Sequence, residues 1–162
     1  MIFITEPDKT CIFAKNRYII RFNNIPSFLD ATLISNVIRD YIVKSNYSID
    51  KLVYNFVTQK EMLEMNKKFL NHSTHTDIIS FNYTDAESLK AEFFISLWAI
   101  ERSAEEEKQS IENECVRVLI HGPLHCMGYN DTSPDKKKEM RILEDDFIRM
   151  FHVKQRLSLI HI

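Results

Sequence analysis

Two histidines and one aspartate stand at a spacing that suits a bound metal ion. His121 and His125 are four residues apart, so a helix places both imidazoles on one face. Gly128 comes three residues later and can end that helix in the left-handed conformation, after which the turn carries Asp131 back toward the imidazoles. The pattern His-x-x-x-His-x-x-Gly-x-x-Asp therefore predicts three metal ligands at the end of a helix, with a fourth position left for water.

Each member of this set also has an ordinary structural interpretation. An isolated pair of histidines at this spacing is more often a coincidence of surface or core than a metal site. Asp131 can instead cap the helix expected to begin near Pro134, although Thr132 and Ser133 are available for that role. We favour the ligand interpretation, because Thr132 or Ser133 can cap the helix in place of Asp131.

The residue after the first histidine argues against one zinc chemistry. A zinc peptidase of the His-Glu-x-x-His type needs a glutamate directly after its first histidine as general base. This chain has Gly122 at that position. Peptide hydrolysis is therefore disfavoured.

The segment HGPLHCMGYND, residues 121–131, resembles the signature of the YbeY-type metal-dependent endoribonucleases, whose usual form is His-Gly-x-Leu-His-Leu-x-Gly-Tyr-Asp-His. The segment NKKFLNHSTHTDIISFNY from Asn66 resembles the family block that ends in Thr-Asp-Val-Leu-Ser-Phe. AEFFIS is similar to the family's Gly-Asp-Ile-x-Ile-Ser strand, and EMRILEDDF to its acidic closing helix. The resemblance covers roughly residues 50–150.

This resemblance implies a function that spacing alone does not. It implies one zinc-type ion per chain, with other divalent transition metals as possible occupants, and hydrolysis of single-stranded RNA. It also implies partners, namely ribosomal RNA and the small ribosomal subunit, through maturation of the 3′ end of small-subunit rRNA and ribosome quality control.

Two positions depart from the family pattern. Asp131 replaces the third histidine of the family with a harder, negatively charged oxygen ligand, which favours tolerance of other divalent ions. Leu70 stands where the family has an arginine that helps with the RNA backbone, so another cation must take that role. We rank His72 first, and the other candidates are Lys67, Lys68 and Arg117, although each is more often an ordinary solvated side chain.

Glu114 lies seven residues before His121, where the resemblance also places a glutamate. A carboxylate there can orient a metal-binding histidine or neighbouring backbone, or it can be a buried structural group. His121, Glu114 and His72 are thus the candidate catalytic residues, and His121, His125 and Asp131 the candidate metal ligands. The general base is not identified by the sequence.

A different class of function is a non-catalytic ribosome-assembly binding factor with a structural metal site. The formal net charge of -2 excludes the global positive field of a tight nonspecific nucleic-acid binder, so any RNA contact must be local. The acidic balance also suits protein partners in ribosome assembly. The open fourth position at the metal argues for the enzyme.

Length and composition bound the organisation of the chain. A chain of 162 residues with 44% hydrophobic residues, two glycines and no linker-like tract is expected to form a single domain over residues 1–162. The amino terminus lacks the pattern of a signal peptide, and no stretch approaches the ~20 apolar residues of a membrane span. Three cysteines without paired spacing suit a reducing cytosol. We therefore expect a soluble, cytoplasmic protein that does not contact membranes.

Hydrophobic periodicity predicts the elements that must position the site. Strands are expected over residues 2–5, 18–22, 52–57, 77–83 and 92–97. Helices are expected over residues 27–42, 58–69, 110–127 and 133–147. Ser27 is expected to cap the first helix, Thr58 and Glu61 to form a capping box, and Ser133 to cap the last helix.

These elements together predict an α+β fold. We expect a small mixed β-sheet of about four strands packed with about five helices, and a zincin-like metal site on the central helix. Val118, Leu119, Ile120 and Leu124 cannot share one narrow stripe, so that helix should be largely buried. Pro123 lies inside it, where a proline typically costs about 3 kcal/mol and bends the helix.

Overall fold

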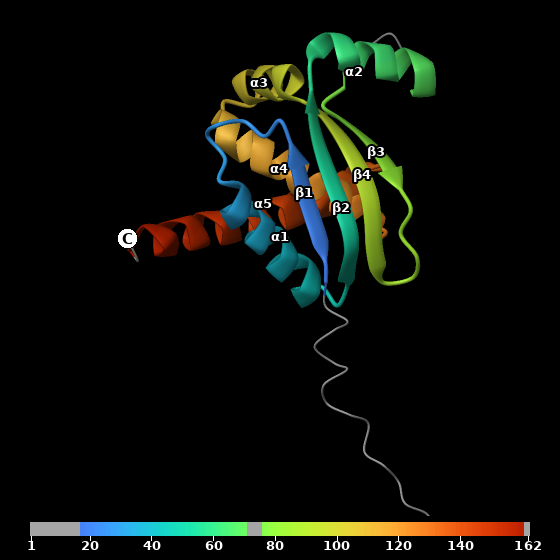
Figure 1. The fold of residues 1–162 in the computed structure, drawn as a ribbon. Helices are drawn as coiled ribbons and strands as arrows, with labels where there is room; N and C mark the ends of the chain where they lie inside the picture. The colour runs from blue at the N-terminus through green and yellow to red at the C-terminus, as the bar shows by residue number, and fades with distance from the viewer. Residues whose placement is uncertain (1–16, 71–75, 161–162) are drawn as a thin grey trace, which may run out of the picture.

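The computed structural model describes residues 17–70 and 76–160. Figure 1 shows the order of its elements along the chain. They are β1 (Ile19–Asn23), α1 (Ala31–Lys44), β2 (Ser48–Val57), α2 (Gln59–Met65), the π-helical turn η3 (Asn66–Leu70), β3 (Ile78–Asn82), β4 (Ser88–Ser96), α3 (Leu97–Glu106), α4 (Ile111–Cys126) and α5 (Pro134–Ile160).

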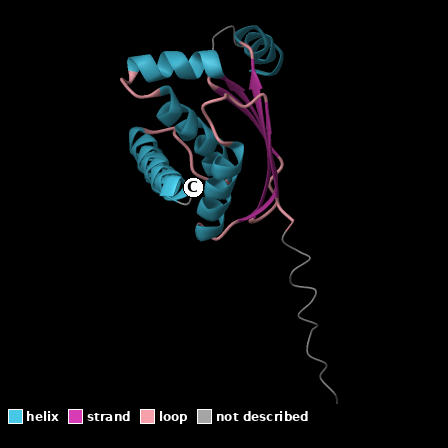
Figure 2. Cartoon of the chain, turned by 60° about the vertical axis from the view of Figure 1, so that its left-hand side comes forward, coloured by secondary structure: helices cyan, strands magenta, loops and turns pink. Residues whose placement is uncertain are grey.

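The four strands form one mixed sheet in the order β1-β2-β4-β3. β1, β2 and β4 are parallel, with Ile20 beside Leu52 and Leu52 beside Ala91, whereas β3 pairs antiparallel with β4. Figure 2 shows the sheet nearly edge-on, with the main layer of helices against one face. The predicted α+β fold is confirmed for the described residues, which form four strands and five α-helices.

Helix α4 is the centre of the helical layer. It contacts α3, α5, β3 and β4, so it is covered on several sides at once. Val116, Leu119, Ile120 and Leu124 are fully buried as a result. The prediction of a largely buried helix is confirmed, and the residues at its carboxyl end are held by the core of the protein.

Two residues fix how closely α4 approaches the sheet. A Cβ atom at Gly122 would lie 2.5 Å from the ring of Phe93 on β4, so only glycine allows this contact. Pro123 follows and cannot donate a backbone hydrogen bond to the carbonyl of Leu119, four residues earlier. The buried hydroxyl of Tyr54 on β2 donates to that carbonyl instead, at 3.0 Å. Helix α4 therefore continues through Pro123 without a buried unsatisfied carbonyl at this point.

Several local expectations can be compared with the structure. The capping box of Thr58 and Glu61 is confirmed, and the backbone N–H of Lys136 donates to Ser133 at the start of α5. The expectation for Ser27 is wrong: a turn closes between Pro26 and Leu29, and Asp30 caps α1 instead. Helix α3 was not expected from the sequence. The strand expected over residues 2–5 lies outside the described residues.

Helix α5 runs far beyond the expected end at residue 147, to Ile160. It packs against α1 and α4, and Lys154 pairs with Asp40 of α1. Among the helices of the described ranges, 17–70 and 76–160, none has the length and apolar character needed to cross a membrane.

A double-mutant cycle can test whether the Tyr54 hydroxyl replaces the missing helix hydrogen bond to the Leu119 carbonyl. Tyr54→Phe removes the hydroxyl donor that replaces the missing proline N–H, so it should lower the free energy of unfolding by about 1–3 kcal/mol. In a Pro123→Ala background the alanine N–H can satisfy Leu119, so the same change should be clearly less destabilising. Urea unfolding of the four proteins measures both values. Equal losses in the two backgrounds would show that the hydroxyl does not substitute for the helix hydrogen bond.

Candidate metal centre

The turn after α4 has the geometry that the sequence suggested. Gly128 has a positive φ of 94°, a conformation that glycine adopts without a steric penalty. Its N–H donates to the carbonyl of His125, and the N–H of Tyr129 donates to the carbonyl of Leu124. This pair of hydrogen bonds is a Schellman motif, which ends the helix and reverses the chain. The reversal carries Asp131 back to the end of α4.

The structure brings the three predicted ligand side chains together. The Nε2 atoms of His121 and His125 lie 3.0 Å apart. Asp131 places its carboxylate oxygens 3.7 Å from Nε2 of His121 and 3.9 Å from Nε2 of His125. One potential ligand atom from each residue lies within 4.8 Å of the others. Within the described part of the chain this is the only such cluster of histidine, cysteine and acidic residues.

These separations fit a small tetrahedral ion. Two ligand atoms at about 2.0–2.1 Å from one tetrahedral zinc ion lie about 3.4 Å apart. The nitrogen pair is slightly closer than this, and the oxygen is slightly farther away. Small side-chain rotations of His125 and Asp131, both partly exposed, would close the set. Two imidazoles and a carboxylate also suit zinc and neighbouring transition metals as donors.

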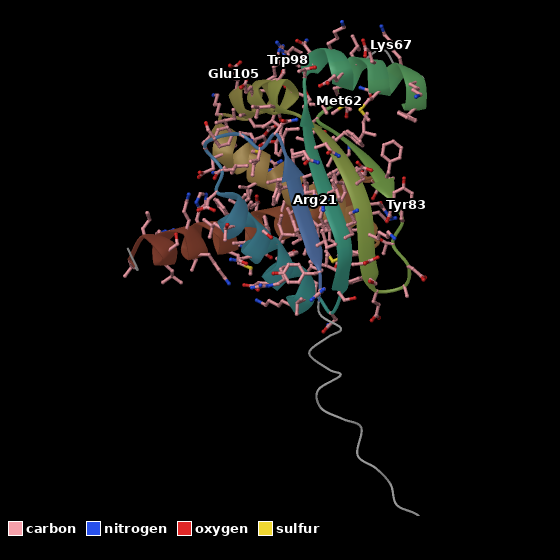
Figure 3. All side chains as sticks on the ribbon, in the orientation of Figure 1. Arg21, Met62, Lys67, Tyr83, Trp98 and Glu105 are labelled. Atoms are coloured by element: carbon pink, nitrogen blue, oxygen red, sulfur yellow. The ribbon has the colours of Figure 1, made fainter. Side chains whose placement is uncertain are left out.

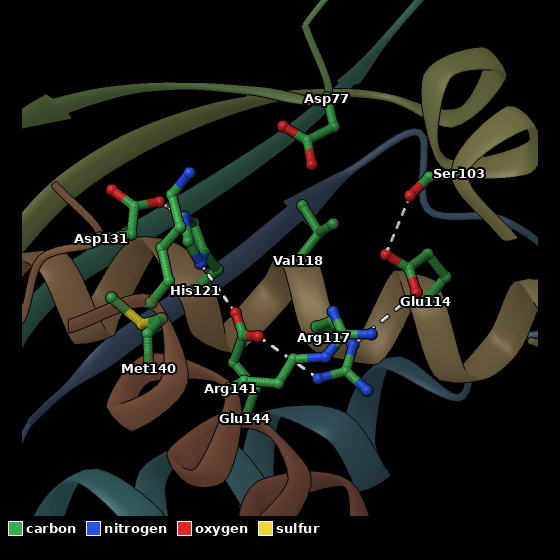
Figure 4. Close-up of a pocket in the computed structure, with 11 residues that line it drawn as sticks. Asp77, Ser103, Glu114, Arg117, Val118, His121, Asp131, Met140, Arg141 and Glu144 are labelled. Atoms are coloured by element: carbon green, nitrogen blue, oxygen red, sulfur yellow. Dashed lines mark hydrogen bonds and ion pairs between the residues drawn. The ribbon is translucent and has the colours of Figure 1, made fainter. Parts of the chain in front are cut away.

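Glu144 of α5 fixes the orientation of His121. Its Oε2 atom accepts a hydrogen bond from Nδ1 of His121 at 2.8 Å (Figure 4). Because a carboxylate only accepts, the proton resides on Nδ1, and the lone pair of Nε2 points toward His125 and Asp131. A carboxylate behind a metal-binding histidine sets its tautomer and strengthens it as a ligand.

Arg117 holds the Glu144 carboxylate in place from the other side. Its Nη1 atom lies 3.3 Å from Glu144, Nη2 lies 2.8 Å from Asp145, and Nε lies 3.7 Å from Glu114. Arg117 is only 7% exposed, so these carboxylates balance its charge inside the protein. Arg117 is therefore a buried, ion-paired side chain and not a solvated one, although it also lines the cavity beside His121.

The neighbouring carboxylates also act on the protonation of His121. Burial alone lowers the pKa of His121, but the hydrogen bond that His121 donates to Glu144 and the charges of Glu144, Asp77 and Asp131 outweigh it, so the pKa is raised. The site thus attracts positive charge to the imidazoles. A divalent cation between His121, His125 and Asp131 would supply that charge in place of a proton.

The cluster opens into a cavity of about 320 Å³ between α4, α5 and the start of β3. Asp77, directly before β3, lines this cavity, and its burial raises the pKa of the carboxyl group. Lys137 and Arg141 of α5 line the same cavity and bring positive charge to its edge. Sequence reasoning did not identify Asp77 or Glu144 as site residues. The only sign of them in the sequence was that both are acidic residues within segments that resemble the family blocks.

The structure does not place the candidate catalytic residue Glu114 beside the three predicted ligands. Glu114 is buried, but its carboxylate accepts from Ser103 at 3.2 Å and lies beside Arg117. The carboxylate that contacts His121 is Glu144, so Glu114 reaches the histidine only through Arg117 and Glu144. His72 lies outside the described residues. Lys67 and Lys68 are exposed on η3 and do not line the cavity.

The fold and the cluster define an α+β protein with a candidate metal centre at the end of its central helix, and sequence comparison narrows this class. The profile of the Endoribonuclease YbeY family matches residues 21–152. The Endoribonuclease YbeY of Flavobacterium psychrophilum is 36% identical over 126 residues, which cover 78% of this chain and 90% of the relative. That of Chlorobaculum tepidum is 34% identical over 127 residues, or 78% of this chain and 93% of the relative. This chain belongs to the Endoribonuclease YbeY family.

A solved structure agrees with the fold. The solution structure of a protein from Thermotoga maritima superposes with a TM-score of 0.63 and covers 86% of this chain and 93% of that one. The two sequences are 22% identical, so this comparison supports the fold alone.

The role assigned to Glu144 can be tested with its neighbour on the same helix as a control. Glu144→Gln keeps the size of the side chain but removes the charge behind His121, so zinc affinity should fall about 10–100-fold. Asp145→Asn also removes a partner of Arg117, yet it leaves the His121 contact intact and should change zinc affinity by less than about threefold. Competition with a chromogenic chelator measures both, and elemental analysis should find about one zinc per wild-type chain. Equal zinc affinities for the two variants would show that Glu144 does not strengthen His121 as a ligand.

Proposed function

We propose that this chain is a metal-dependent, single-strand-specific endoribonuclease. It acts in ribosomal RNA processing, at the 3′ end of small-subunit rRNA, and in ribosome quality control. The observation that carries the proposal is the convergence of two Nε2 atoms 3.0 Å apart with a carboxylate, beside an open cavity, in a member of the Endoribonuclease YbeY family.

His121, His125 and Asp131 would hold the ion, which we propose to be zinc. Such an ion, when bound, supplies Lewis-acid stabilisation of a phosphate oxygen and lowers the pKa of a coordinated water. Asp131 contributes a negative charge that a third histidine would not. We therefore expect the site to accept other divalent transition metals and to need a higher pH for activity than a three-histidine site.

The remaining side chains of the cavity can be given roles from their positions. Asp77 faces the cavity next to His121 and can receive a proton from the attacking water at its carboxylate, a role that its raised pKa supports. Glu144 keeps Nδ1 of His121 protonated and the ring in one orientation. Arg117 pairs with Glu144, and Glu114 pairs with Arg117, so we assign both as positioning residues that act on His121 through Glu144.

Positive side chains are needed to hold the RNA backbone, because Leu70 stands where the family resemblance implies an arginine. Lys137 and Arg141 fit this need, since both are exposed and both line the cavity that contains His121 and Asp131, whereas Arg117 lines it as a buried, ion-paired side chain. Cations beside a scissile phosphate stabilise the charge that develops during cleavage. His72 stays a proposed contributor on the grounds of sequence.

The competing proposal is a non-catalytic ribosome-assembly factor whose metal is structural. A structural zinc ion has four protein ligands and no open position. The described residues supply three at this site, and the cavity lies beside them. This arrangement favours the enzyme, with small-subunit ribosomal RNA and assembly proteins as partners in either case.

Cleavage of labelled single-stranded RNA tests the proposed activity. Because Lewis-acid stabilisation contributes several kcal/mol, His121→Ala and Asp131→Asn should each reduce the rate by at least about 1000-fold, as should a chelator. Asp135→Asn, an exposed acidic residue at the start of α5, is the matched control and should cleave at the wild-type rate. Equal rates for wild type and His121→Ala would reject the metal-dependent mechanism. A metal-loaded wild-type protein that does not cleave would favour the assembly factor.

A further inference from the structure

A second hollow continues from the metal site along α3. Its volume is about 650 Å³, and it shares Asp77 and Ser103 with the cavity that contains His121. Ser103 donates a hydrogen bond to Glu114, so the wall between the two hollows is tied to the network behind the metal site. The two hollows are therefore neighbours, separated by Asp77 and Ser103, and one RNA strand can reach both.

The side chains of α3 give the second hollow a distinct chemistry. Ala99, Arg102, Ser103 and Glu106 line it from positions that fall on one face of a helix, and the small side chain of Ala99 leaves room there. Trp98 lines it as well, from the first turn of α3, and Figure 3 shows this residue at the end of the helix that lies toward α2. The guanidinium carbon of Arg102 lies 5.1 Å from the centre of the Trp98 ring.

We propose that the hollow beside α3 is a subsite for one nucleobase of the RNA strand, with Trp98 as its stacking partner. This rests on the proposed function, because the base belongs to the strand whose phosphate reaches His121. Aromatic rings and arginine planes are the usual partners of unpaired bases in single-stranded RNA. The volume suits a base with its ribose, and Arg102 can stack on the base or contact the adjoining phosphate.

The acidic residues of the hollow disfavour a small anion as its ligand. Asp77 and Glu106 oppose the single positive charge of Arg102, so the hollow is poorly suited to a free phosphate or another small anion. A neutral, flat ring with one attached phosphate fits this balance better. The amino groups of a base can also donate to Glu106, which only accepts.

Trp98 is the only tryptophan of the chain, so its fluorescence reports on the subsite directly. Adenosine 5′-monophosphate, which has no internal phosphodiester bond to cleave, should quench the emission of the metal-loaded wild-type protein in a saturable way. Ribose 5-phosphate, which lacks the base, should quench it little. Arg102→Gln should weaken the quenching by the nucleotide several-fold, whereas Glu105→Gln, an exposed neighbour that does not line the hollow, should not.

The kinetic counterpart separates binding from chemistry. Trp98→Ala should raise KM for a short single-stranded RNA about tenfold with little change in kcat, and Trp98→Phe should restore most of the loss. Thermal melting confirms that each variant is folded. Equal quenching by the nucleotide and ribose 5-phosphate, or none by either, overturns the inference whether or not RNA is cleaved. Base-dependent quenching without any cleavage supports the subsite and contradicts the proposed nuclease alone.

Discussion

The hydrogen bond between Glu144 and His121 is the contact on which the arrangement of the site depends. It joins α5 to α4 and decides which imidazole nitrogen carries the proton, so that Nε2 of His121 faces His125 and Asp131 with a free lone pair. A buried carboxylate needs a compensating charge, and Arg117 supplies it from the preceding turn of α4. The candidate centre is therefore a network in which an arginine holds a carboxylate, the carboxylate orients a histidine, and that histidine presents a ligand atom.

This network is accurate only if α4 is fixed relative to the sheet. Gly122 lets the helix come close to Phe93, and Pro123 frees a carbonyl that Tyr54 of β2 then occupies. Interiors packed in this way resist small displacements, so the helix that carries both histidines has little freedom to shift. Glycine and proline usually weaken a helix, but here Gly122 and Pro123, directly after His121, fix α4 against the sheet.

Sequence reasoning succeeded where the determining interactions are local. The mixed sheet, the burial of α4 and the capping box of Thr58 follow from periodicity and short-range hydrogen bonding, as does the left-handed turn at Gly128. It failed where contacts join distant segments. Glu144 meets His121 only because α5 packs on α4, whereas Glu114, two helical turns from His121, faces Ser103 and Arg117. The ion pairs of Arg117 with Glu144 and Asp145 likewise depend on α5, so the sequence of its own helix did not reveal them.

We propose that His121, His125 and Asp131 share one metal ion through Nε2, Nε2 and a carboxylate oxygen. A crystal structure of the zinc-loaded protein, with anomalous scattering measured on both sides of the zinc absorption edge, tests it most directly. We expect a single strong anomalous peak at about 2.0–2.2 Å from all three atoms, with Nδ1 of His121 still hydrogen-bonded to Glu144. A zinc peak elsewhere, or one at the two histidines with the Asp131 side chain turned toward solvent, would contradict it.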